Sequence, residues 1–468
     1  MTDSIDPEAL AAEVAGSNFD DERLNKRLRL LVAGLAAEPA RSLPRSLDEA
    51  GLEAAYRFFS NVRVTPDDIL SSHVEATRKR CDEAEDFLIL HDSTKFSYRY
   101  DGEREGLGRA QRGNTRSMQM FFAHLSLAVA ADGTRRPLGV AAFTTWVRGE
   151  TPTGTEYQRW ERQARIASER LGGLNKAIHV MDREADDYDM FASFVRDGHR
   201  FVVRSQHNRW LEQEGPSRLR DVFAQLECTV DREARLSQRK SNRDPVIAKI
   251  HPARAARSTN LSVAATTVAL KRPQSRRAHV DTASLPPSLT VNVVRVWERE
   301  PPAGAEPVEW FLLTTEPIAT AEQQLAIVDH YRARWTIEEY FKALKTGCDF
   351  EKKQLQDYES LINLLAVFAP IAYQLLLIRS EARRVPDESA LTVLTADHID
   401  VLRAKGRTKL SANPSTREIY LAIAILGGHI KYSKKDPGWL TLARGFEDLE
   451  LLAEGWRLAK LQQRSDQR

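Results

Sequence analysis

The 468-residue sequence has little cysteine, and its three cysteines, Cys81, Cys228 and Cys348, lie far apart. Because no CxxC pair occurs, the sequence has neither a disulfide framework nor the ligands of a structural zinc ribbon, and a reducing cytoplasm is the expected compartment. Glycine (23 residues) and proline (20 residues) are too scarce for a collagen-like or low-complexity chain. A hydrophobic content of 42% also excludes a chain that is disordered throughout.

Long hydrophobic runs are nearly absent as well. The first fifteen residues are acidic and contain neither a basic nor an apolar region, so we expect no secretion signal there. One uncharged stretch, residues 361–378, has the length of a short membrane span, but Asn363, Pro370 and Gln374 interrupt it. We therefore predict a buried core helix in this stretch and no membrane association.

The net charge of +2 conceals an uneven distribution. Between Arg232 and Arg277, twelve Lys and Arg residues stand against two acids, Glu233 and Asp244, which gives a local balance of +10. A basic stretch on an otherwise acidic chain indicates contact with a polyanion at one place. A solvated surface face accounts for the same charge equally well, and both interpretations stay open from the sequence.

Four regions differ in their patterning. Residues 1–80 are predicted to form short helices joined by turns, which suits a DNA-binding module or any helical cap. Residues 81–355 are predicted to alternate strands and helices, in the order strand, strand, strand, helix, strand, helix, strand. Residues 206–306 break this order and are predicted to form an inserted β-rich subdomain. Residues 356–468 are predominantly helical by their periodicity.

Two short apolar runs, 87–90 and 178–181, are predicted to be buried strands, and each leads into an aspartate, Asp92 or Asp182. In α/β sheets, sites gather at the carboxyl ends of the strands. Each aspartate alone is weak support for a site, because aspartate also caps helices and starts turns, and Asp182 precedes a predicted helix.

Residues 320–345 are predicted to form one long helix. At 100° per residue, Tyr331, Arg334, Glu338 and Lys345 fall within an arc of about 60° and span about 21 Å. One helix face would thus present a hydroxyl, two cations and a carboxylate. A solvated face with an Arg334–Glu338 ion pair at i,i+4 spacing is the alternative interpretation.

Asp92, Asp182 and Glu338 are three carboxylates from three separated elements. Hard cations such as Mg²⁺ and Mn²⁺ prefer carboxylate oxygen, so the set fits a divalent metal site. Two such ions, about 3.5–4 Å apart, activate a water or hydroxyl and stabilise the leaving oxygen of an in-line phosphoryl transfer. The neighbouring Arg and Lys residues would hold the phosphodiester backbone.

Three sequence blocks form one pattern along the chain. They are Leu90-His-Asp92-Ser-Thr94 with Phe96-Ser-Tyr98-Arg, then Met181-Asp182-Arg183-Glu184-Ala185-Asp186 with Arg200-Phe-Val-Val-Arg204-Ser, then Trp310-Phe-Leu-Leu-Thr-Thr-Glu-Pro317 with Tyr331-x2-Arg334-x3-Glu338-x6-Lys345. This pattern resembles the DDE transposases of bacterial cut-and-paste insertion elements, in the IS-four family that includes the Tn-five transposase. The last spacing is that family's Tyr–Arg–Glu–Lys signature, and the resemblance extends over nearly the whole chain.

The resemblance implies an α/β fold with a ribonuclease-H-like catalytic core, an inserted β-rich subdomain, and helical domains on both sides. Residues 1–80 would be a helical DNA-binding domain, and residues 81–355 the catalytic core, with the insertion at about 206–306. Residues 356–468 would be a helical dimerisation domain.

The resemblance also implies residue roles. Asp92, Asp182 and Glu338 would be the catalytic residues and would bind Mg²⁺, with Mn²⁺ as a substitute. The implied DNA-binding residues form two groups. Tyr331, Arg334 and Lys345 would contact phosphates. Arg204 and Trp310 would support a hairpin step, in which the Trp310 ring stacks where a base has flipped out of the duplex.

The implied function is cut-and-paste transposition. The protein would bind the terminal inverted repeats of double-stranded DNA, cleave the element ends through a hairpin intermediate, and join them to target DNA. It would act as a homodimer on DNA in the bacterial cytoplasm, associated with the nucleoid. An amphipathic tail, residues 440–461, with Leu442, Phe446, Leu449 and Leu452 at near-helical spacing, could pair the subunits or pack on its own domain.

Three other functions compete with this one. A ribonuclease-H-like nuclease that cuts without joining has little use for the complete signature helix. A non-catalytic DNA-binding protein derived from a transposase would be expected to have lost a carboxylate, and none is lost. A glycosidase with two carboxylates leaves the cationic helix face and the basic stretch unexplained.

Overall fold

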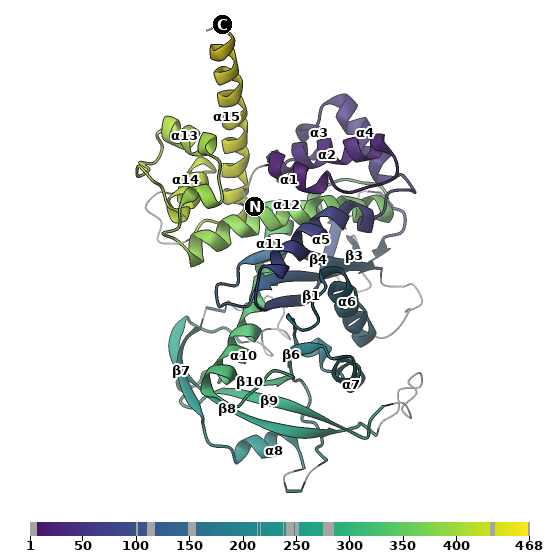
Figure 1. Cartoon of the computed structure of the whole chain (residues 1–468), viewed down its shortest axis with the longest axis vertical. Helices are drawn as coiled ribbons and strands as arrows, with labels where there is room; N and C mark the ends of the chain where they lie inside the picture. The colour runs from purple at the N-terminus through teal and green to yellow at the C-terminus, as the bar shows by residue number, and fades with distance from the viewer. Residues whose placement is uncertain are drawn as a thin grey trace.

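The computed structural model describes residues 7–99, 102–109, 118–147, 156–212, 214–215, 217–236, 238–239, 248, 252–274, 285–430 and 436–466. Figure 1 shows a large sheet in the body of the molecule, with the helices of both chain ends gathered at one end of it and the strands of the inserted segment at the other. The predicted mixed α/β class with helical flanks is thus confirmed.

Five helices make up the N-terminal region. The longer ones begin at side chains that cap the exposed backbone amides, such as Thr65, whose hydroxyl accepts from the Asp68 amide while Pro66 opens the first turn. The helices are α1 (Pro7–Val14), α2 (Glu22–Ala37), α3 (Leu43–Ser46), α4 (Glu49–Phe59) and α5 (Pro66–Asp82).

Ten strands of the described residues form one sheet, in the order β2-β3-β1-β5-β6-β10-β9-β8-β7, with β4 beside β3. β5 is parallel to β1 and β6, and the other pairs are antiparallel. The strands are β1 (Phe87–Arg99), β2 (Gly108–Arg109), β3 (Met118–Ala130), β4 (Pro137–Trp146), β5 (Ala177–Met181), β6 (Arg200–Arg204), β7 (Val230–Leu236), β8 (Arg257–Lys271), β9 (Ser288–Glu298) and β10 (Glu309–Thr314).

The predicted order of elements from residue 86 to 204 is confirmed, with α6 (Glu156–Leu171) and α7 (Tyr188–Asp197) in the expected places. One boundary is wrong. The first strand does not end before Asp92 but continues to Arg99, because all of its thirteen residues pair with β3. Asp92 therefore lies inside a strand, two residues beyond the part of β1 that pairs with β5.

Residues 206–306 contain a short helix, α8 (Leu219–Ala224), and the strands β7, β8 and β9. The β-rich character is as predicted, but these strands do not form a sheet of their own. Through the pairing of β9 with β10 they extend the central sheet.

The long helix predicted for residues 320–345 is interrupted. It consists of α10 (Ala321–Ala333) and α11 (Trp335–Lys342), with a break at Arg334, and it ends in a π-helical turn, Ala343–Gly347. At the break, backbone hydrogen bonds span three residues rather than four, from the Arg334 amide to Tyr331 and from the Ile337 amide to Arg334. The single-helix prediction is therefore wrong in detail.

The uncharged stretch forms the centre of α12 (Tyr358–Arg384), which has the length and composition of a membrane span but 94% of that window buried inside the protein. This confirms the predicted core helix. α12 packs against α2, α4, α5, α14 and β4, and it lies beneath both groups of terminal helices (Figure 1).

The remaining helices are α13 (Ala396–Lys405), α14 (Thr416–Leu426) and α15 (Trp439–Asp466), and α15 extends away from the body to the C-terminus (Figure 1). Gly427 and Gly445 allow α14 and α15 to meet, since a Cβ on Gly445 would lie 1.8 Å from the Ile423 carbonyl oxygen. Leu442, Phe446 and Leu449 are buried in this chain, so the tail packs on its own domain through these residues.

A line of buried histidines crosses the sheet on the side of α6. Nε2 of His91 (β1) lies 2.9 Å from Nδ1 of His179 (β5), and the other nitrogen of His179 lies 2.9 Å from the Ser168 hydroxyl on α6. His124 on β3 lies 2.9 Å from the Ser93 hydroxyl. These rings join β3, β1, β5 and α6 through hydrogen bonds where a purely apolar core would give no fixed partners.

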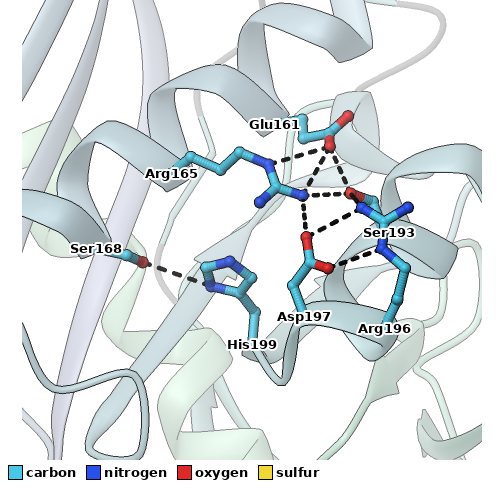
Figure 2. A network of polar contacts seen from close by, with 7 residues as sticks. All are labelled: Glu161, Arg165, Ser168, Ser193, Arg196, Asp197 and His199. Atoms are coloured by element: carbon cyan, nitrogen blue, oxygen red, sulfur yellow. Dashed lines mark hydrogen bonds and ion pairs between the residues drawn. The ribbon is translucent and has the colours of Figure 1, made fainter.

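α6 is also fixed to α7, as Figure 2 shows. Arg165 on α6 donates to Glu161 on its own helix and to Asp197 at the end of α7, at 2.5 Å. Beside this cluster, Ser168 approaches His199 at 3.5 Å. The two helices on this side of the sheet are therefore held to each other and, through Ser168, to the strand that leads into Asp182.

The buried histidines make stability depend on pH. Burial, with a smaller contribution from His199, lowers the pKa of His179 to about 3, and burial with Arg159 lowers that of His124 to about 3. Below about pH 6.5 the unfolded chain takes up protons on these rings and the folded chain does not, so the free energy of unfolding should fall as the pH falls from about 7 to 5.

His179→Gln removes one such ring and should reduce that decline by about 1.4 kcal/mol per pH unit below the unfolded pKa. Urea unfolding followed by tryptophan fluorescence measures it, with the exposed His207→Gln as the control. Equal pH dependence in all three proteins would contradict the assignment of His179 as a buried neutral group.

Candidate active site

Three adjacent parallel strands align the first site residues. In β1 and β5, Leu90 pairs with Val180, and in β5 and β6, Val180 pairs with Val202. Continuing both registers to the next positions on the same face brings Asp92, Asp182 and Arg204 into one row across the sheet. The antiparallel pairing of Arg204 with Leu312 on β10 extends this row, and Trp310 lies two residues along on the same face.

The break between α10 and α11 places Arg334 over this row. Its Nη1 donates to Oδ2 of Asp92 at 2.9 Å, and its Nη2 donates to Oε1 of Glu338 at 2.7 Å. One guanidinium thus connects a carboxylate of the strand with a carboxylate of the helix. All three side chains are largely buried, with exposed fractions of 13% for Arg334, 19% for Asp92 and 28% for Glu338.

The electrostatics of this cluster are governed by Asp92. Burial raises its pKa to about 7 although Arg334 acts in the opposite direction, and the negative charges of Asp182 and Glu338 raise it further. Asp182 and Glu338 therefore both lie within electrostatic reach of Asp92. Among the described residues, however, no three carboxylate, imidazole or thiol groups are close enough together to hold one ion. Arg334 provides the positive charge in this arrangement.

The donor chemistry fits a divalent cation. The row on the sheet and α11 supply carboxylate oxygens, the ligands that Mg²⁺ and Mn²⁺ prefer, and burial leaves this negative charge poorly solvated. Asp182 also caps the 3-10 turn Arg183–Ala185, accepting from the Glu184 amide at 2.8 Å through Oδ1. Asp182 therefore caps a turn, as the sequence allowed, and its Oδ2 takes no part in that hydrogen bond.

Tyr331 lies beside two further residues predicted to bind DNA, Arg204 and Trp310. Arg204 lies close enough for its charge to act on the Tyr331 hydroxyl, and the Tyr331 ring meets that of Trp310 edge-on, with ring centroids 5.5 Å apart. Burial raises the Tyr331 pKa, and the charges of Arg204 and Arg334 oppose that rise. The structure thus places Arg204, Trp310, Tyr331 and Arg334 beside Asp92 and Glu338, with Asp182 next to Asp92 in the row across the sheet.

Lys345 lies apart from this group. It belongs to the π-helical turn, and its Nζ donates to the Lys95 carbonyl at 2.5 Å and lies 5.1 Å from the centre of the Phe96 ring. Burial lowers the pKa of this amine. Because Lys95 is three residues beyond Asp92 on β1, Lys345 is about 10 Å further along the strand.

The basic stretch from Arg232 to Arg277 is partly neutralised where the structure describes it. Arg232 pairs with Asp329 at 2.6 Å, Lys271 with Glu212 at 2.8 Å, and Arg239 and Arg257 pair with acids as well. Four of the seven described cations of the stretch are therefore paired with acids from elsewhere in the chain. Residues 237, 240–247, 249–251 and 275–277 of the stretch lie outside the described residues.

Sequence reasoning did not single out Asp186, although it stands in the second block. This buried carboxylate accepts from the amides of Gln206 at 2.6 Å and His207 at 2.9 Å, from the Ser205 hydroxyl at 3.1 Å and from Nε of Arg209 at 3.0 Å. It ties the turn after Asp182 to the segment after Arg204. Its place four residues after Asp182 was the available signal, but its partners are set by tertiary structure.

Asp186→Asn should destabilise the protein by about 3–5 kcal/mol, because it leaves the Arg209 guanidinium buried without its carboxylate. Urea unfolding measures this, and Asp221→Asn, which changes an exposed carboxylate on α8, serves as the control. A loss no greater than that of the control would show that Asp186 does not hold this turn.

Two family models match parts of the sequence. Residues 6–64 match a family model described as "Transposase DNA-binding", and residues 88–369 match one described as "Transposase DDE domain". Among solved structures, the chain is similar to a piggyBac transposase in a synaptic complex with hairpin DNA, at 9% identity and a TM-score of 0.31, over 87% of this chain and 80% of that one. The DDE match covers more than half of the sequence and contains Asp92, Asp182 and Glu338. The protein is a transposase with a DNA-binding domain and a DDE domain, and it belongs to the DDE transposase family.

Proposed function

We propose that this protein is a cut-and-paste DNA transposase of the IS-four type, similar to the Tn-five transposase, which cleaves the ends of its element through a hairpin and joins them to target DNA. The observation that supports the proposal is that Arg334 joins Asp92 on β1 to Glu338 on α11 inside the matched DDE domain, with Asp182 close enough to act on the charge of Asp92. The Tyr331–Arg334–Glu338–Lys345 spacing supports the family, and the strand order β4-β3-β1-β5-β6 supports a ribonuclease-H-like core.

The domain organisation follows the same proposal. Residues 1–80 bind DNA, in agreement with the match of residues 6–64 to a transposase DNA-binding family. Residues 81–355 form the catalytic core, with the insertion at about 206–306, and residues 356–468 pair two subunits. The protein acts in the bacterial cytoplasm, on nucleoid DNA.

DDE domains generally use divalent metal ions, and we propose Mg²⁺, with Mn²⁺ as a substitute, held by Asp92, Asp182 and Glu338. Such ions supply a nucleophile activated at neutral pH and stabilise the leaving oxygen of a phosphoryl transfer. Arg334 meets Asp92 and Glu338 with two different nitrogens. The same guanidinium can exchange these carboxylates for phosphate oxygens when DNA enters, because its planar fork suits either anion.

The remaining residues orient the DNA. Arg204 and Tyr331 lie close to each other beside the carboxylates, and both offer donors to a backbone phosphate. The half-buried Trp310 ring, held edge-on by Tyr331, offers a stacking face for the base next to a flipped nucleotide. Lys345 would contact a phosphate further along the strand, about 10 Å from Asp92.

Asp92→Asn, Asp182→Asn and Glu338→Gln should each reduce cleavage of the element end by a factor of about 10³ or more, since each removes a ligand charge from the site. End binding should persist or tighten, because less negative charge faces the phosphates. Gel assays of binding and cleavage on duplex DNA from the element end measure both. Glu322→Gln, an exposed change on α10, should cleave normally. Retained cleavage in any of the three carboxylate variants would remove that residue from the site.

We further propose that the active species is a dimer that cleaves in trans, each subunit binding one end and cutting the other. The distal half of α15 exposes Leu451, Leu458 and Leu461, with exposed fractions of 58%, 56% and 61%, within an arc of about 80° on one face. This stripe, rather than the buried Leu442, Phe446 and Leu449, is the surface available for pairing.

A mixing experiment tests trans cleavage. One subunit carries Glu338→Ala, and the other lacks the DNA-binding residues 6–64. If cleavage is in trans, the mixture should cut DNA ends that neither protein cuts alone. A complex of one subunit with one end that cleaves at the full rate would contradict the proposal.

A further inference from the structure

A cavity lies outside the carboxylate site, where the DNA-binding region meets the catalytic core. It has a volume of about 630 Å³ and is enclosed by three segments that are far apart in sequence. These are residues 40–42 between α2 and α3, the end of β1 with its neighbours, and residues 349–354 after α11. We call it the junction pocket.

The lining of the junction pocket is strongly cationic. It includes Arg41, Arg99, Arg104, Lys352 and Lys353, against the two acids Asp349 and Glu351, so its formal balance is +3. The side chain of Arg99 is exposed and has no hydrogen-bond or ion-pair partner among the described residues. Lys352 is 76% exposed and reaches Asp349 at 2.7 Å, an exposed pair of little energetic value.

Arg104 and Lys353 are held in place by backbone carbonyls. Arg104 donates to Leu355 at 3.2 Å and to Arg99 at 2.9 Å. Lys353, which is 2% exposed, donates to the Pro39 carbonyl at 2.9 Å and also to that of Arg41. This amine therefore joins the loop between α2 and α3 to the catalytic core. The positions of Arg104 and Lys353 in the pocket are thus fixed by hydrogen bonds within the protein.

An orphaned donor lines the same pocket. Tyr98 is 2% exposed, and its hydroxyl has no hydrogen-bond partner among the described residues. Buried tyrosine hydroxyls normally have a partner, so one without it beside a cluster of cations indicates a place for a further acceptor. The Arg104 guanidinium lies 5.5 Å from the centre of the Tyr98 ring, and both residues line the junction pocket.

We propose that the junction pocket binds a backbone phosphate of the element DNA, at a fixed distance from the reacting phosphate. The proposal rests on the proposed function, since it takes the element end as the ligand. Arginine forks, an ammonium group and a tyrosine hydroxyl are the donors that phosphodiesters attract. Tyr98 lies six residues beyond Asp92 on β1, about 20 Å along the strand. For a duplex whose axis runs along β1, at about 3.4 Å per base pair, this places the bound phosphate about six base pairs from the cleaved bond.

The position of the pocket gives it a role in register. A phosphate bound there touches the loop between α2 and α3 of the DNA-binding region, the strand that carries Asp92 and the segment that follows α11. DNA held by the N-terminal region is thereby aligned with the carboxylates through one shared contact. The junction pocket thus fixes the distance between the DNA sequence that the N-terminal region recognises and the phosphate that is cleaved.

Two variants test the proposal without touching the carboxylate site. The double variant Arg99→Gln, Lys352→Gln removes two exposed cations and should reduce the salt dependence of binding to end duplex by about 0.9 for each lost phosphate contact. Tyr98→Phe keeps the ring and removes only the donor. It should weaken binding by about 2- to 10-fold while leaving the thermal midpoint unchanged or raised, because no hydrogen bond of the free protein is lost.

The matched control is Lys405→Gln, Lys409→Gln, which removes the same charge from exposed positions in the C-terminal region and should leave the slope at the wild-type value. Duplexes in which one phosphate at a time is replaced by a neutral methylphosphonate locate the contact. Neutralising the phosphate about six base pairs from the cleavage point should weaken wild-type binding and leave the double variant unaffected.

If both pocket variants bind with the affinity and salt dependence of the wild-type protein, and the wild-type protein binds and cleaves the duplex normally, the proposed phosphate site is wrong and the proposed function stands. Wild-type protein that neither binds nor cleaves duplex from either element end would overturn both.

Discussion

The register of β1, β5 and β6 is the constraint on which the site depends. Parallel pairing of these three strands brings Asp92, Asp182 and Arg204 into one row on one face, although up to 112 positions separate them in sequence. A slip of one residue would turn any of them to the opposite face. On that opposite face, the His91–His179 contact joins β1 to β5 close to the two aspartates. The geometry of the site therefore depends on buried contacts that touch no DNA.

The second requirement is a positive charge for the buried carboxylates. Arg334 meets it by bridging Asp92 and Glu338, and the break between α10 and α11 is what brings its guanidinium to both. An arginine that already holds the carboxylates keeps the acidic cluster stable without a bound ion or DNA. Under the proposed function, this guanidinium would exchange its carboxylate partners for a phosphate when DNA binds.

Much of this could be predicted from sequence because it depends on local signals. The apolar runs before Asp92 and Asp182, the spacing from Tyr331 to Lys345 and the apolar stretch of α12 all lie within single elements. What could not be predicted depends on distant partners. β1 continues past Asp92 because β3 pairs with it, and Arg232 is neutralised by Asp329, 97 positions away. The Arg334 bridge likewise needed a strand 242 positions earlier in the chain.

The measurement that tests the central claim most directly is an anomalous difference map from crystals of the protein with element-end DNA and Mn²⁺. If Asp92, Asp182 and Glu338 form the metal site of a cut-and-paste transposase, anomalous peaks should lie among these three carboxylates and next to the scissile phosphate, with Arg334 no longer bridging Asp92 and Glu338. Peaks elsewhere, or DNA bound with its cleavage point away from this row of the sheet, would contradict the account.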